Sequence, residues 1–573
     1  MKQVICLWLG LMGVQALLAQ QVNRFQQWTG LSEEVITAVE TDAAGNRYLS
    51  GYFGNTMDLP GDTWTGVGFR DGFLLKVNAV GETEWALQLG SQFNDEAHGV
   101  GVDPEGNVTV LLNHNDTLHF QGQAIFSASL WSLISVDANG QFRWAKNPFV
   151  EVPLFWNLVD MDVNAQGEIA LAGDVGFPAN SPDVLTFADT SLQTAFGSNG
   201  SFVPQAWVAT YDSEGNFQWA ASTQAIGASG AFGFAVDINE AGEVLLGGRF
   251  SNDPVTTQDL GFGGSSLTFD LPFGGESVFV SQWSATGTLE WADALTLEAS
   301  ANPFGNQITF ASMDWSPEGE IALSGRFEGS FVFADDTLTT PQGGLFPTQY
   351  SFVSRWGESL ERKQAQAIPI SGQGSPFPIS SLAFGPEGSL LIGGGVTDSI
   401  QVDGVWISDP NLGLFVAELD SLGKYQWHHL IEDAGFEPLL EDATWAPTGE
   451  WLAVGAVEPP ASIGDSSLTQ PAGTSCCFSA ILVAIEAGGA TTSIEAEWMA
   501  SLQVFPNPAT GRCHIQASER LQQVRLLDLI GRPIPAEVSI TGAEASVRTN
   551  FRGLALLQVI GESGMRNKRL LFR

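Results

Sequence analysis

The sequence predicts an all-β fold in which one four-stranded unit is repeated seven times, followed by a small, separate β domain. Three observations support this prediction. A turn glycine followed by an apolar run recurs seven times, at Gly45, Gly106, Gly167, Gly242, Gly319, Gly388 and Gly449. A glycine followed four residues later by tryptophan recurs five times, ending in Trp85, Trp144, Trp219, Trp291 and Trp427. The 65 glycines, set against only 23 Lys and Arg, are typical of turn-rich β structure, since glycine weakens helices and supplies the positive φ of tight turns.

The chain is long and apolar enough for a large core. Its 573 residues exceed the usual size of one compact domain unless the domain is a repeat array. With 44% hydrophobic residues and 18 tryptophans, wholesale disorder is excluded. Almost no helix is expected beyond the first residues.

Residues 1–20 are predicted to be a secretory signal peptide. Lys2 precedes an apolar run that ends in small residues at Ala19, as cleavage requires. Elsewhere the sequence has no stretch of roughly 18 apolar residues, so the mature protein is expected to be secreted without inserting into a membrane.

Charge divides the chain in two. Residues 1–494 hold 13 Lys and Arg against 57 Asp and Glu, whereas residues 495–573 hold 10 against 7. An acidic body repels nucleic acids and anionic membranes, so neither is an expected partner. The acidity is interpreted first as a means of solubility in a salty habitat.

Each repeat is predicted to form four strands. The turn glycines are spaced by 61, 61, 75, 77, 69 and 61 residues, and in six of the seven repeats a second glycine follows six residues later. Short apolar runs between turn clusters indicate two hairpins per repeat. Such a unit cannot bury its apolar face alone, and radial stacking of four-stranded sheets gives a β-propeller of about 4 to 8 blades. Residues 21–487 are therefore predicted to form a seven-bladed β-propeller.

The last repeat lacks its tryptophan strand. The mature N-terminus carries Arg24-Phe25-Gln26-Gln27-Trp28, which is similar to the tryptophan strands of other repeats. We therefore predict that this N-terminal strand completes the seventh blade and removes an open sheet edge. Trp28, Trp85, Trp144, Trp219, Trp291 and Trp427 are then expected to pack between blades. A row of aromatic rings for carbohydrate stacking is the alternative.

Asp-x-x-Gly-Asn turns, such as 42–46 and 103–107, give residues 21–490 a resemblance to β-propeller repeats of large secreted bacterial proteins. The Gly-x-x-x-Trp spacing also resembles the tryptophan-docking motif of quinoprotein propellers, some of which have adjacent cysteines like Cys476 and Cys477. Those enzymes usually have eight units, and no set of cofactor and calcium ligands is identified here. The sialidase Asp-box is excluded because its aromatic residue follows glycine by three positions.

The C-terminal region, 503–573, contains in order Pro506, Asn507, Pro508, Gly511, Gly531 and Lys568. In these positions it resembles the type A sorting domain of the type IX secretion system. Ala555 stands where tyrosine is common in that family. Its proline-rich start and alternating strands also favour a small β-sandwich. The resemblance implies the type IX machinery as partner, export from a Bacteroidota-type cell and display on the cell surface, with residues 488–502 as the linker.

No catalytic, cofactor-binding or metal-binding residue is predicted. His114 and His119 lie near Asp116, but their spacing matches no familiar metal-ligand pattern and a polar loop explains it. The sequence has no Gly-x-Ser-x-Gly, Walker or His-Glu-x-x-His motif, and its many carboxylates single out no acid and base pair. Cys476 and Cys477 are interpreted as small buried residues, with an adjacent disulfide as the alternative.

The longest predicted loops, 174–204 and 249–275, are rich in phenylalanine. They contain Phe177, Phe187, Phe196, Phe202, Phe262, Phe269 and Phe273. These residues would form either an aromatic rim for binding or, as the simpler interpretation, extra hairpins that pack on themselves.

The expected function is a secreted or cell-surface module, non-catalytic, that binds glycan or protein in adhesion. The alternative is a propeller-fold hydrolase or lyase that acts on glycans, or more remotely a quinoprotein dehydrogenase.

Overall fold

The structure is a computed structural model, and it describes most of the chain after the first 21 residues. The described residues are 22–126, 129–152, 155–176, 184–193, 204–226, 230–251, 258–262, 265–269, 276–297, 307–341, 349–371, 379–396, 399–408, 413–432, 434, 439–463, 466–468, 478–486, 503–505, 512–516, 520–527, 532, 534–561 and 564–572. The predicted signal peptide, the linker 488–502 and the pair Cys476 and Cys477 lie outside them.

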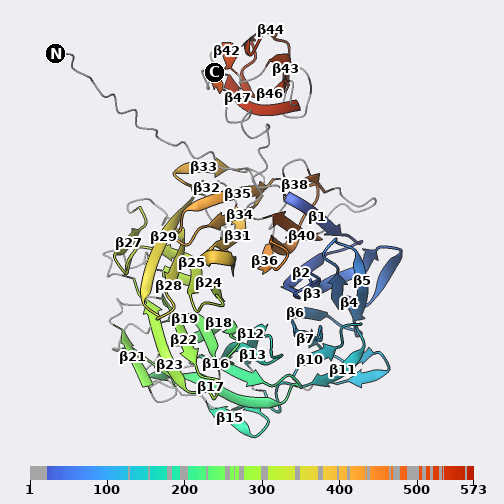
Figure 1. Ribbon diagram of the computed structural model, residues 1–573, viewed down its shortest axis with the longest axis vertical. Coiled ribbons are helices and arrows are strands. Elements are labelled where there is room, and N and C mark those ends of the chain that lie inside the picture. Colours follow the sequence, from blue (N-terminus) through green and yellow to red (C-terminus); the bar gives the residue numbers. More distant parts are fainter. Residues whose placement is uncertain are drawn as a thin grey trace, which may run out of the picture. The chain divides into compact units, whose positions relative to one another are not determined.

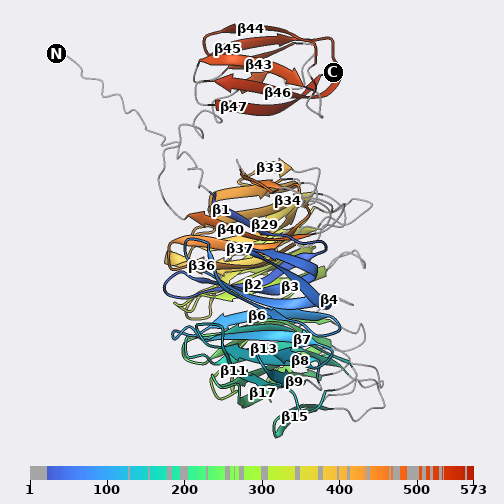
Figure 2. The same cartoon turned by 90° about the vertical axis from the view of Figure 1, so that its right-hand side faces the viewer.

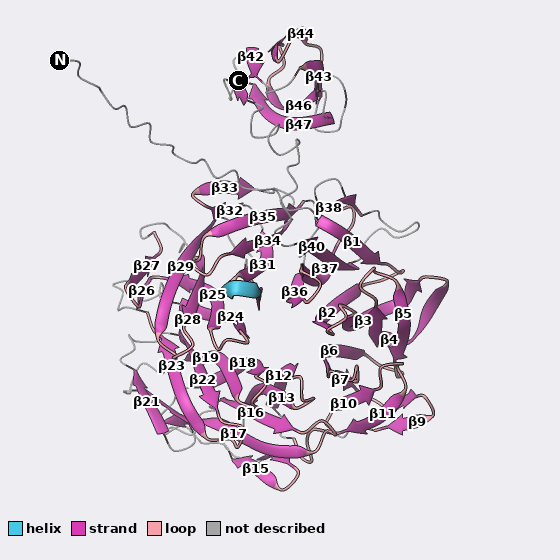
Figure 3. Cartoon of the chain, in the orientation of Figure 1, coloured by secondary structure: helices cyan, strands magenta, loops and turns pink. Residues whose placement is uncertain are grey.

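The chain divides into two compact units. Gln21–Ala487 forms one, and Gly488–Arg573 is grouped with Met1–Gln20 in the other. The prediction of an all-β fold is confirmed, because in the described residues the only helical segment is the short 3-10 turn η1 (Pro386–Gly388) (Figure 3). No helix in the described part of the chain has the length and apolar character needed to cross a membrane.

In its described residues, the first unit contains seven large antiparallel sheets, each with a core of four strands. The innermost strands are β2 (Glu34–Thr41), β6 (Asp95–Val102), β12 (Phe155–Val163), β18 (Gly230–Ile238), β24 (Gln307–Trp315), β30 (Ser381–Phe384) and β36 (Leu439–Ala446). The second strands are β3 (Arg47–Leu59), β7 (Val108–His114), β13 (Ile169–Gly176), β19 (Val244–Ser251), β25 (Ile321–Glu328), β31 (Leu390–Val396) and β37 (Glu450–Val457). The third strands are β4 (Asp62–Val77), β10 (Trp131–Val136), β16 (Gln205–Tyr211), β22 (Glu276–Trp283), β28 (Tyr350–Trp356), β34 (Gly413–Leu419) and β40 (Ser479–Glu486). The outer strands are β5 (Thr83–Leu89), β11 (Phe142–Lys146), β17 (Phe217–Ile226), β23 (Leu289–Leu295), β29 (Arg362–Ser371), β35 (Tyr425–Ile431) and β1 (Val22–Trp28).

The seven sheets follow one another around a common centre (Figure 1). Each innermost strand contacts the innermost strand of the next sheet, and β36 contacts β2, so the ring is closed. The central strands of the sheets are covered on both faces by neighbouring sheets. For this reason β10 and β16 bury every residue, although a strand with one exposed face would alternate.

A short hairpin interrupts the connection between the second and third strands in six of the sheets. These hairpins are β8 (Leu118–Phe120) with β9 (Gln123–Ile125), β14 (Val184–Phe187) with β15 (Thr190–Gln193), β20 (Gln258–Phe262) with β21 (Ser265–Phe269), β26 (Ser330–Phe333) with β27 (Asp336–Thr339), β32 (Ser399–Val402) with β33 (Val405–Ser408), and β38 (Ser462–Ile463) with β39 (Ser466–Ser467). In the first sheet the long strands β3 and β4 extend directly into the equivalent hairpin.

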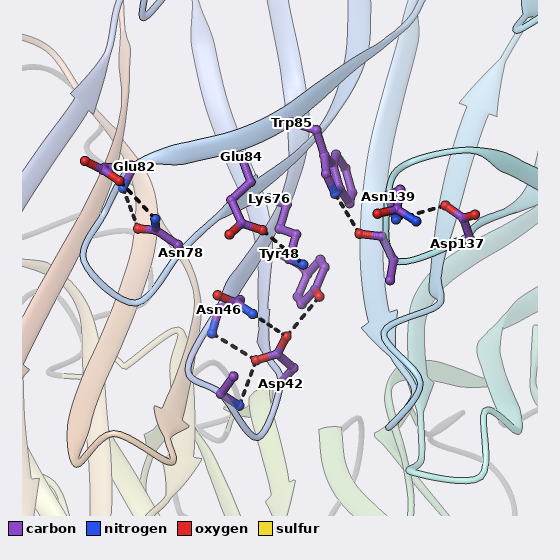
Figure 4. Close-up of polar contacts among 12 residues, drawn as sticks. Asp42, Asn46, Tyr48, Lys76, Asn78, Glu82, Glu84, Trp85, Asp137 and Asn139 are labelled. Carbon is purple, nitrogen blue, oxygen red and sulfur yellow. Dashed lines mark hydrogen bonds and ion pairs between the residues drawn. The ribbon is translucent and has the colours of Figure 1, made fainter.

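In the first sheet, one acidic side chain holds the turn between the innermost and second strands. In the first sheet the Asp42 carboxylate accepts hydrogen bonds from the N–H groups of Ala44 and Asn46, from Asn46 Nδ2 at 2.7 Å and from the Tyr48 hydroxyl at 3.0 Å (Figure 4). Gly45 in this turn has a φ of 78°, which a residue with a side chain rarely adopts. The Asp-x-x-Gly-Asn sequence is therefore a turn signal.

The predicted pairing of the N-terminal strand with the end of the seventh repeat is confirmed. β1 pairs antiparallel with β40 and completes the sheet β1-β40-β37-β36. A buried ion pair reinforces the contact between the first and last sheets, since Arg47 on β3 meets Glu450 on β37 at 2.6 Å. Both chain ends of the unit thus contribute to one sheet.

The prediction that Trp28 takes the place of the missing tryptophan is wrong. In the first sheet, Trp85 on the outer strand pairs with Lys76, and the pairing register shifts immediately beside this pair. In the last sheet, the residue beside the equivalent register shift is Arg24, which pairs with Ala484. Trp28 lies four positions further along β1, and only 2% of its surface is exposed. The prediction matched the segments by their aromatic residues. In the structure the outer strands match at their β-bulges, and this places Arg24 at the position that tryptophan has in other repeats.

The second unit consists of two sheets around one apolar core. One sheet contains β41 (Gln503–Phe505), β42 (Arg512–Gln516), β45 (Glu544–Arg548) and β44 (Glu537–Thr541), and the other contains β43 (Leu521–Leu527), β46 (Gly553–Gly561) and β47 (Gly564–Phe572). Figure 2 shows these two layers from the side. Both sheets contribute to the buried cluster that includes Ile515, Val547 and Leu557.

We expect Trp28→Ala to destabilise the first unit strongly, because it leaves a cavity between the first and last sheets. Replacing a buried aromatic residue with alanine costs about 3–5 kcal/mol. Phe69→Ala is the control, since Phe69 is 77% exposed and its loss should cost no more than about 0.5 kcal/mol. Denaturant unfolding followed by circular dichroism measures both, and equal losses of unfolding free energy would contradict a role for β1 in closing the ring.

Candidate functional site

A pocket lies where the seven innermost strands meet. Its volume is about 450 Å³, and it is lined by residues of every innermost strand, from Thr37 on β2 to Trp445 on β36. This volume falls in the range of small-molecule sites, roughly 300–1,000 Å³. The ring of sheets therefore builds one shared pocket from all seven repeats.

A β-bulge recurs at the same place in six of the innermost strands. The pairing register shifts at Thr37, His98, Val159, Phe234, Ala311 and Glu441. Each of these residues precedes the turn glycine of its repeat by eight positions, and each lines the pocket. A bulge re-aims a side chain that regular pairing would direct elsewhere. Residues with different chemistry are thus presented at equivalent points of the wall.

Seven carboxyl groups line the pocket. They belong to Glu40, Asp160, Asp162, Asp237, Asp314, Glu441 and Asp442. Four of them, Glu40, Asp162, Asp237 and Asp314, precede the turn glycine of their repeat by five residues. Among the described residues of the wall none is lysine or arginine. The pocket is therefore strongly acidic.

The aspartates join neighbouring innermost strands. Asp442 accepts a hydrogen bond from the Val39 N–H at 2.9 Å, which connects the seventh sheet to the first. Asp160 and Asp162 on β12 accept bonds from β18, at the N–H groups of Val236 (2.9 Å) and Ile238 (2.8 Å).

The same kind of contact joins β18 to β24 and β24 to β30. Asp237 accepts a bond from the Trp315 N–H at 2.8 Å, and Asp314 accepts one from the Phe384 N–H. An innermost strand has no neighbouring strand on its inner edge, so its N–H groups need other acceptors. The carboxylates supply them.

Burial raises the pKa of these carboxyl groups. It raises the pKa of Asp160 and of Asp442 to about 7, although backbone N–H donors oppose the shift. It raises the pKa of Asp314 to about 6. The pKa of Asp237 lies well above its usual range, through burial first and then through the neighbouring Asp162 and Asp314. Two carboxyl groups in hydrogen-bond contact cannot both ionise cheaply, so each of these aspartates opposes ionisation of its neighbour.

The two glutamates are less constrained. Glu40 accepts a hydrogen bond only from the N–H of Thr41, at 3.2 Å, within the described residues. Burial raises its pKa well above the usual range, and Asp162 and Asp442 add to the shift. Desolvation by the pocket wall also raises the pKa of Glu441, which stands at a bulge with part of its side chain exposed. Both side chains therefore have oxygen atoms available to a ligand.

Aromatic side chains occupy other parts of the wall. Phe234 stacks on Phe310 with ring centroids 6.0 Å apart, and Trp445 meets Trp451 edge to face at 4.8 Å. Trp315 also lines the pocket. These contacts hold the rings in place, so the pocket offers fixed apolar faces beside its carboxyl groups.

The tryptophans identified in the sequence lie away from this pocket, in the outer strands. Trp85 packs against the turn of the next repeat, where its Nε1 donates to the Ala138 carbonyl at 3.1 Å (Figure 4). Trp219 donates to the Ala285 carbonyl in the same way at 3.0 Å. Trp144 lies against Gly215, and Trp291 meets Trp356 edge to face at 6.3 Å.

Two repeats vary this arrangement. Trp427 donates its Nε1 hydrogen to Glu418 on the paired strand. In the fifth repeat the residue beside the register shift is Gln364, which lies against Gly423 of the next turn.

Other residues identified in the sequence have structural surroundings or fall outside the description. Phe187 is buried and packs against Phe149, Trp207 and Phe217, so its hairpin packs on the sheet. Phe262 and Phe269 lie in β20 and β21, whereas Phe177, Phe196, Phe202 and Phe273 lie outside the described residues. His114 is buried, and its ring nitrogens bond to the Asp116 carbonyl and the Ser132 hydroxyl.

Pro506, Asn507, Pro508, Gly511 and Gly531 lie outside the described residues. Lys568 belongs to β47, opposite Leu557 on β46.

The carboxyl-lined pocket was missed in the sequence, although a signal exists. Acidic residues stand five positions before the turn glycine in four of seven repeats. In a chain with 64 Asp and Glu this coincidence is visible only after the repeats are aligned on that glycine.

No protein-family model matches the chain, and no curated protein matches it. The solved structures that resemble it include a protein of unknown function from Bacteroides caccae, with 12% identity, a TM-score of 0.29, and coverage of 63% of this chain and 90% of that one. A Dyadobacter fermentans protein of unknown function has 10% identity, a TM-score of 0.34, and coverage of 81% and 99%. The extracellular domain of a protein described as a one-component system from B. thetaiotaomicron has 10% identity, a TM-score of 0.19, and coverage of 94% and 73%.

We expect the stability of the protein to fall as the pH rises from about 4 to about 7. Carboxyl groups whose folded pKa is raised bind protons more tightly in the folded state, so the stability they contribute is present at low pH and lost through the folded pKa. Glu40→Gln removes one such group and should raise the unfolding free energy at pH 8 on the order of 1–2 kcal/mol, with little change at pH 4.

Thermal unfolding across this pH range measures the effect. Glu105→Gln, in an exposed turn, is the control and should keep the pH dependence of the natural protein. A steeper loss of stability in Glu40→Gln than in the control would contradict the assignment.

Proposed function

We propose that this chain is a secreted seven-bladed β-propeller that acts as a non-catalytic binding or adhesion module for extracellular glycan or protein. Seven four-stranded sheets in a closed ring, with the N-terminal strand in the last sheet, support the propeller. The observation that carries the function is the central pocket, which combines fixed aromatic rings with carboxyl groups. Such walls suit polar ligands that also have an apolar face.

Binding is favoured over catalysis because the pocket aspartates are already engaged in hydrogen bonds with backbone N–H groups. A general acid or base must exchange a proton with its substrate within hydrogen-bond reach. Asp160 and Asp442 each accept one bond from the next N–H of their own strand and one from the neighbouring strand. Their oxygens therefore hold the wall of the pocket in shape.

A glycan-active hydrolase or lyase is the second candidate, and one observation favours it. Asp237 lies between Asp162 and Asp314, in hydrogen-bond contact with both. Neighbouring carboxyl groups with separated pKa values are the usual source of an acid and a base. The quinoprotein alternative has weaker support, because the tryptophans behind that resemblance pack against turns of the next repeat, as Trp85 does.

We also propose export by the type IX secretion machinery, with the C-terminal unit as its signal and the cell surface as the destination. The support is the order of sequence motifs from Pro506 to Lys568, together with a two-sheet unit that is compact by itself. Nucleic acid is not proposed as a partner, since the body of the chain is strongly acidic.

Binding is tested with the full mature chain on glycan arrays and on panels of extracellular proteins. We expect retention of at least one ligand, and a loss of about tenfold or more in affinity for Trp445→Ala, which removes an aromatic face of the pocket. Trp406→Ala is the matched control, because Trp406 lies on the β32–β33 hairpin and is 47% exposed. Release of products from a bound polysaccharide over time would contradict the non-catalytic binding function and support the glycan-active enzyme.

Export is tested by deleting residues 503–573 in a cell that has the type IX machinery. The full chain should reach the cell surface, and the truncated chain should accumulate in the periplasm. Immunoblots of periplasmic and surface fractions measure this, with the intact first unit as the loading control. Surface display of the truncated chain would rule out the proposed signal.

A further inference from the structure

Among the described residues, the central pocket gathers seven carboxyl groups and no basic lysine or arginine side chain. Titratable groups face it from six innermost strands: Glu40 on β2, His98 on β6, Asp160 and Asp162 on β12, Asp237 on β18, Asp314 on β24, and Glu441 and Asp442 on β36. The seventh, β30, contributes serine and apolar residues. No lysine or arginine is present among the described lining residues. Buried carboxylates without a cation are costly, because neighbouring protein replaces the water that would stabilise them.

The carboxyl groups differ in what they can offer a ligand. The five aspartates are engaged by backbone N–H groups or by each other, as described above. Glu40 leaves one oxygen without a hydrogen bond within the described residues, and Glu441 projects from a bulge. These two longer side chains are therefore the groups best able to reach into the pocket.

The dimensions of the site argue against a bare metal ion. The described residues contain no group of three or more His, Cys, Asp and Glu side chains arranged to hold one. A volume of about 450 Å³ is far larger than a single ion needs. A molecule that carries its charge on an organic frame fills this space and also contacts the aromatic wall.

The aromatic residues point to the same kind of ligand. Trp315, Trp445 and Phe234 line the pocket together with the glutamates. An ammonium or guanidinium group is attracted to the face of an aromatic ring, most strongly to tryptophan, within about 6 Å. Carboxyl groups beside aromatic faces therefore suit an organic cation, whereas a neutral sugar would bring no positive charge to pair with the glutamates.

We propose that the central pocket binds a small ligand through a primary amine or guanidinium group, which Glu441 and Glu40 hold against the aromatic wall. This inference rests on the proposed binding function and names its ligand class. The amine of an amino sugar and the side chain of a basic amino acid share this chemistry.

The experiment uses the full mature chain and isothermal titration calorimetry at neutral pH. Glucosamine is compared with glucose, and lysine amide with its side-chain-acetylated form, because each pair differs mainly in the charged amine. We expect the charged member of at least one pair to bind about tenfold more tightly. The pair that responds distinguishes an amino sugar from a basic amino acid.

Two substitutions locate the site. Glu441→Gln and Glu40→Gln should each weaken binding of the charged ligand by about tenfold, since each keeps the size of the side chain but removes the carboxyl group that ionises to pair with a bound cation. Glu105→Gln should leave it unchanged. Thermal unfolding checks that each variant is folded, and either glutamate variant alone suffices if the other fails to fold.

The outcomes separate the two proposals. Equal affinity for charged and neutral members, or binding that neither glutamate variant weakens, would overturn the organic-cation site and leave a binding module intact. If no glycan, protein or amine binds at all, both the site and the proposed function fail.

Discussion

The pairing of β1 with β40 is the constraint on which the rest of the first unit depends. A ring of sheets can close only if its last sheet is complete, because an incomplete sheet presents an unpaired edge. Here the missing strand comes from the other end of the unit, so the chain ends are tied together. Closure brings β36 beside β2, and only then does a pocket exist that all seven innermost strands share.

Closure creates a second problem, which the aspartates solve. Each innermost strand has an inner edge that no strand covers, and its N–H groups must find acceptors. Asp442, Asp237 and Asp314 reach across to the next strand and provide them. The need for acceptors at the inner edges thus places carboxyl groups at the centre of the ring. Their mutual repulsion and their burial reduce the stability of the folded protein. The same arrangement gives the pocket its acidity, so scaffold and candidate site are built from one set of residues.

The sequence predicted the repeat count and the strand order because both are recorded in local patterns. Turn glycines at regular spacing mark the hairpins, and the absence of a tryptophan strand near residue 490 pointed to the N-terminal segment. The assignment of Trp28 failed for a physical reason. A tryptophan can be recognised by its neighbours in sequence, but its position in a sheet is set by register, and the register shift between Val22 and Arg24 moved Arg24 into the expected place.

By itself, the sequence determined the all-β class, the repeating unit and the origin of the closing strand, since turn chemistry and apolar periodicity act over a few residues. It left the candidate site undetermined. Glu40 and Glu441 are separated by some 400 residues, and each looked like one acid among many. Only the tertiary structure brought them to one pocket, because convergence depends on the ring closing and on bulges that aim side chains inward.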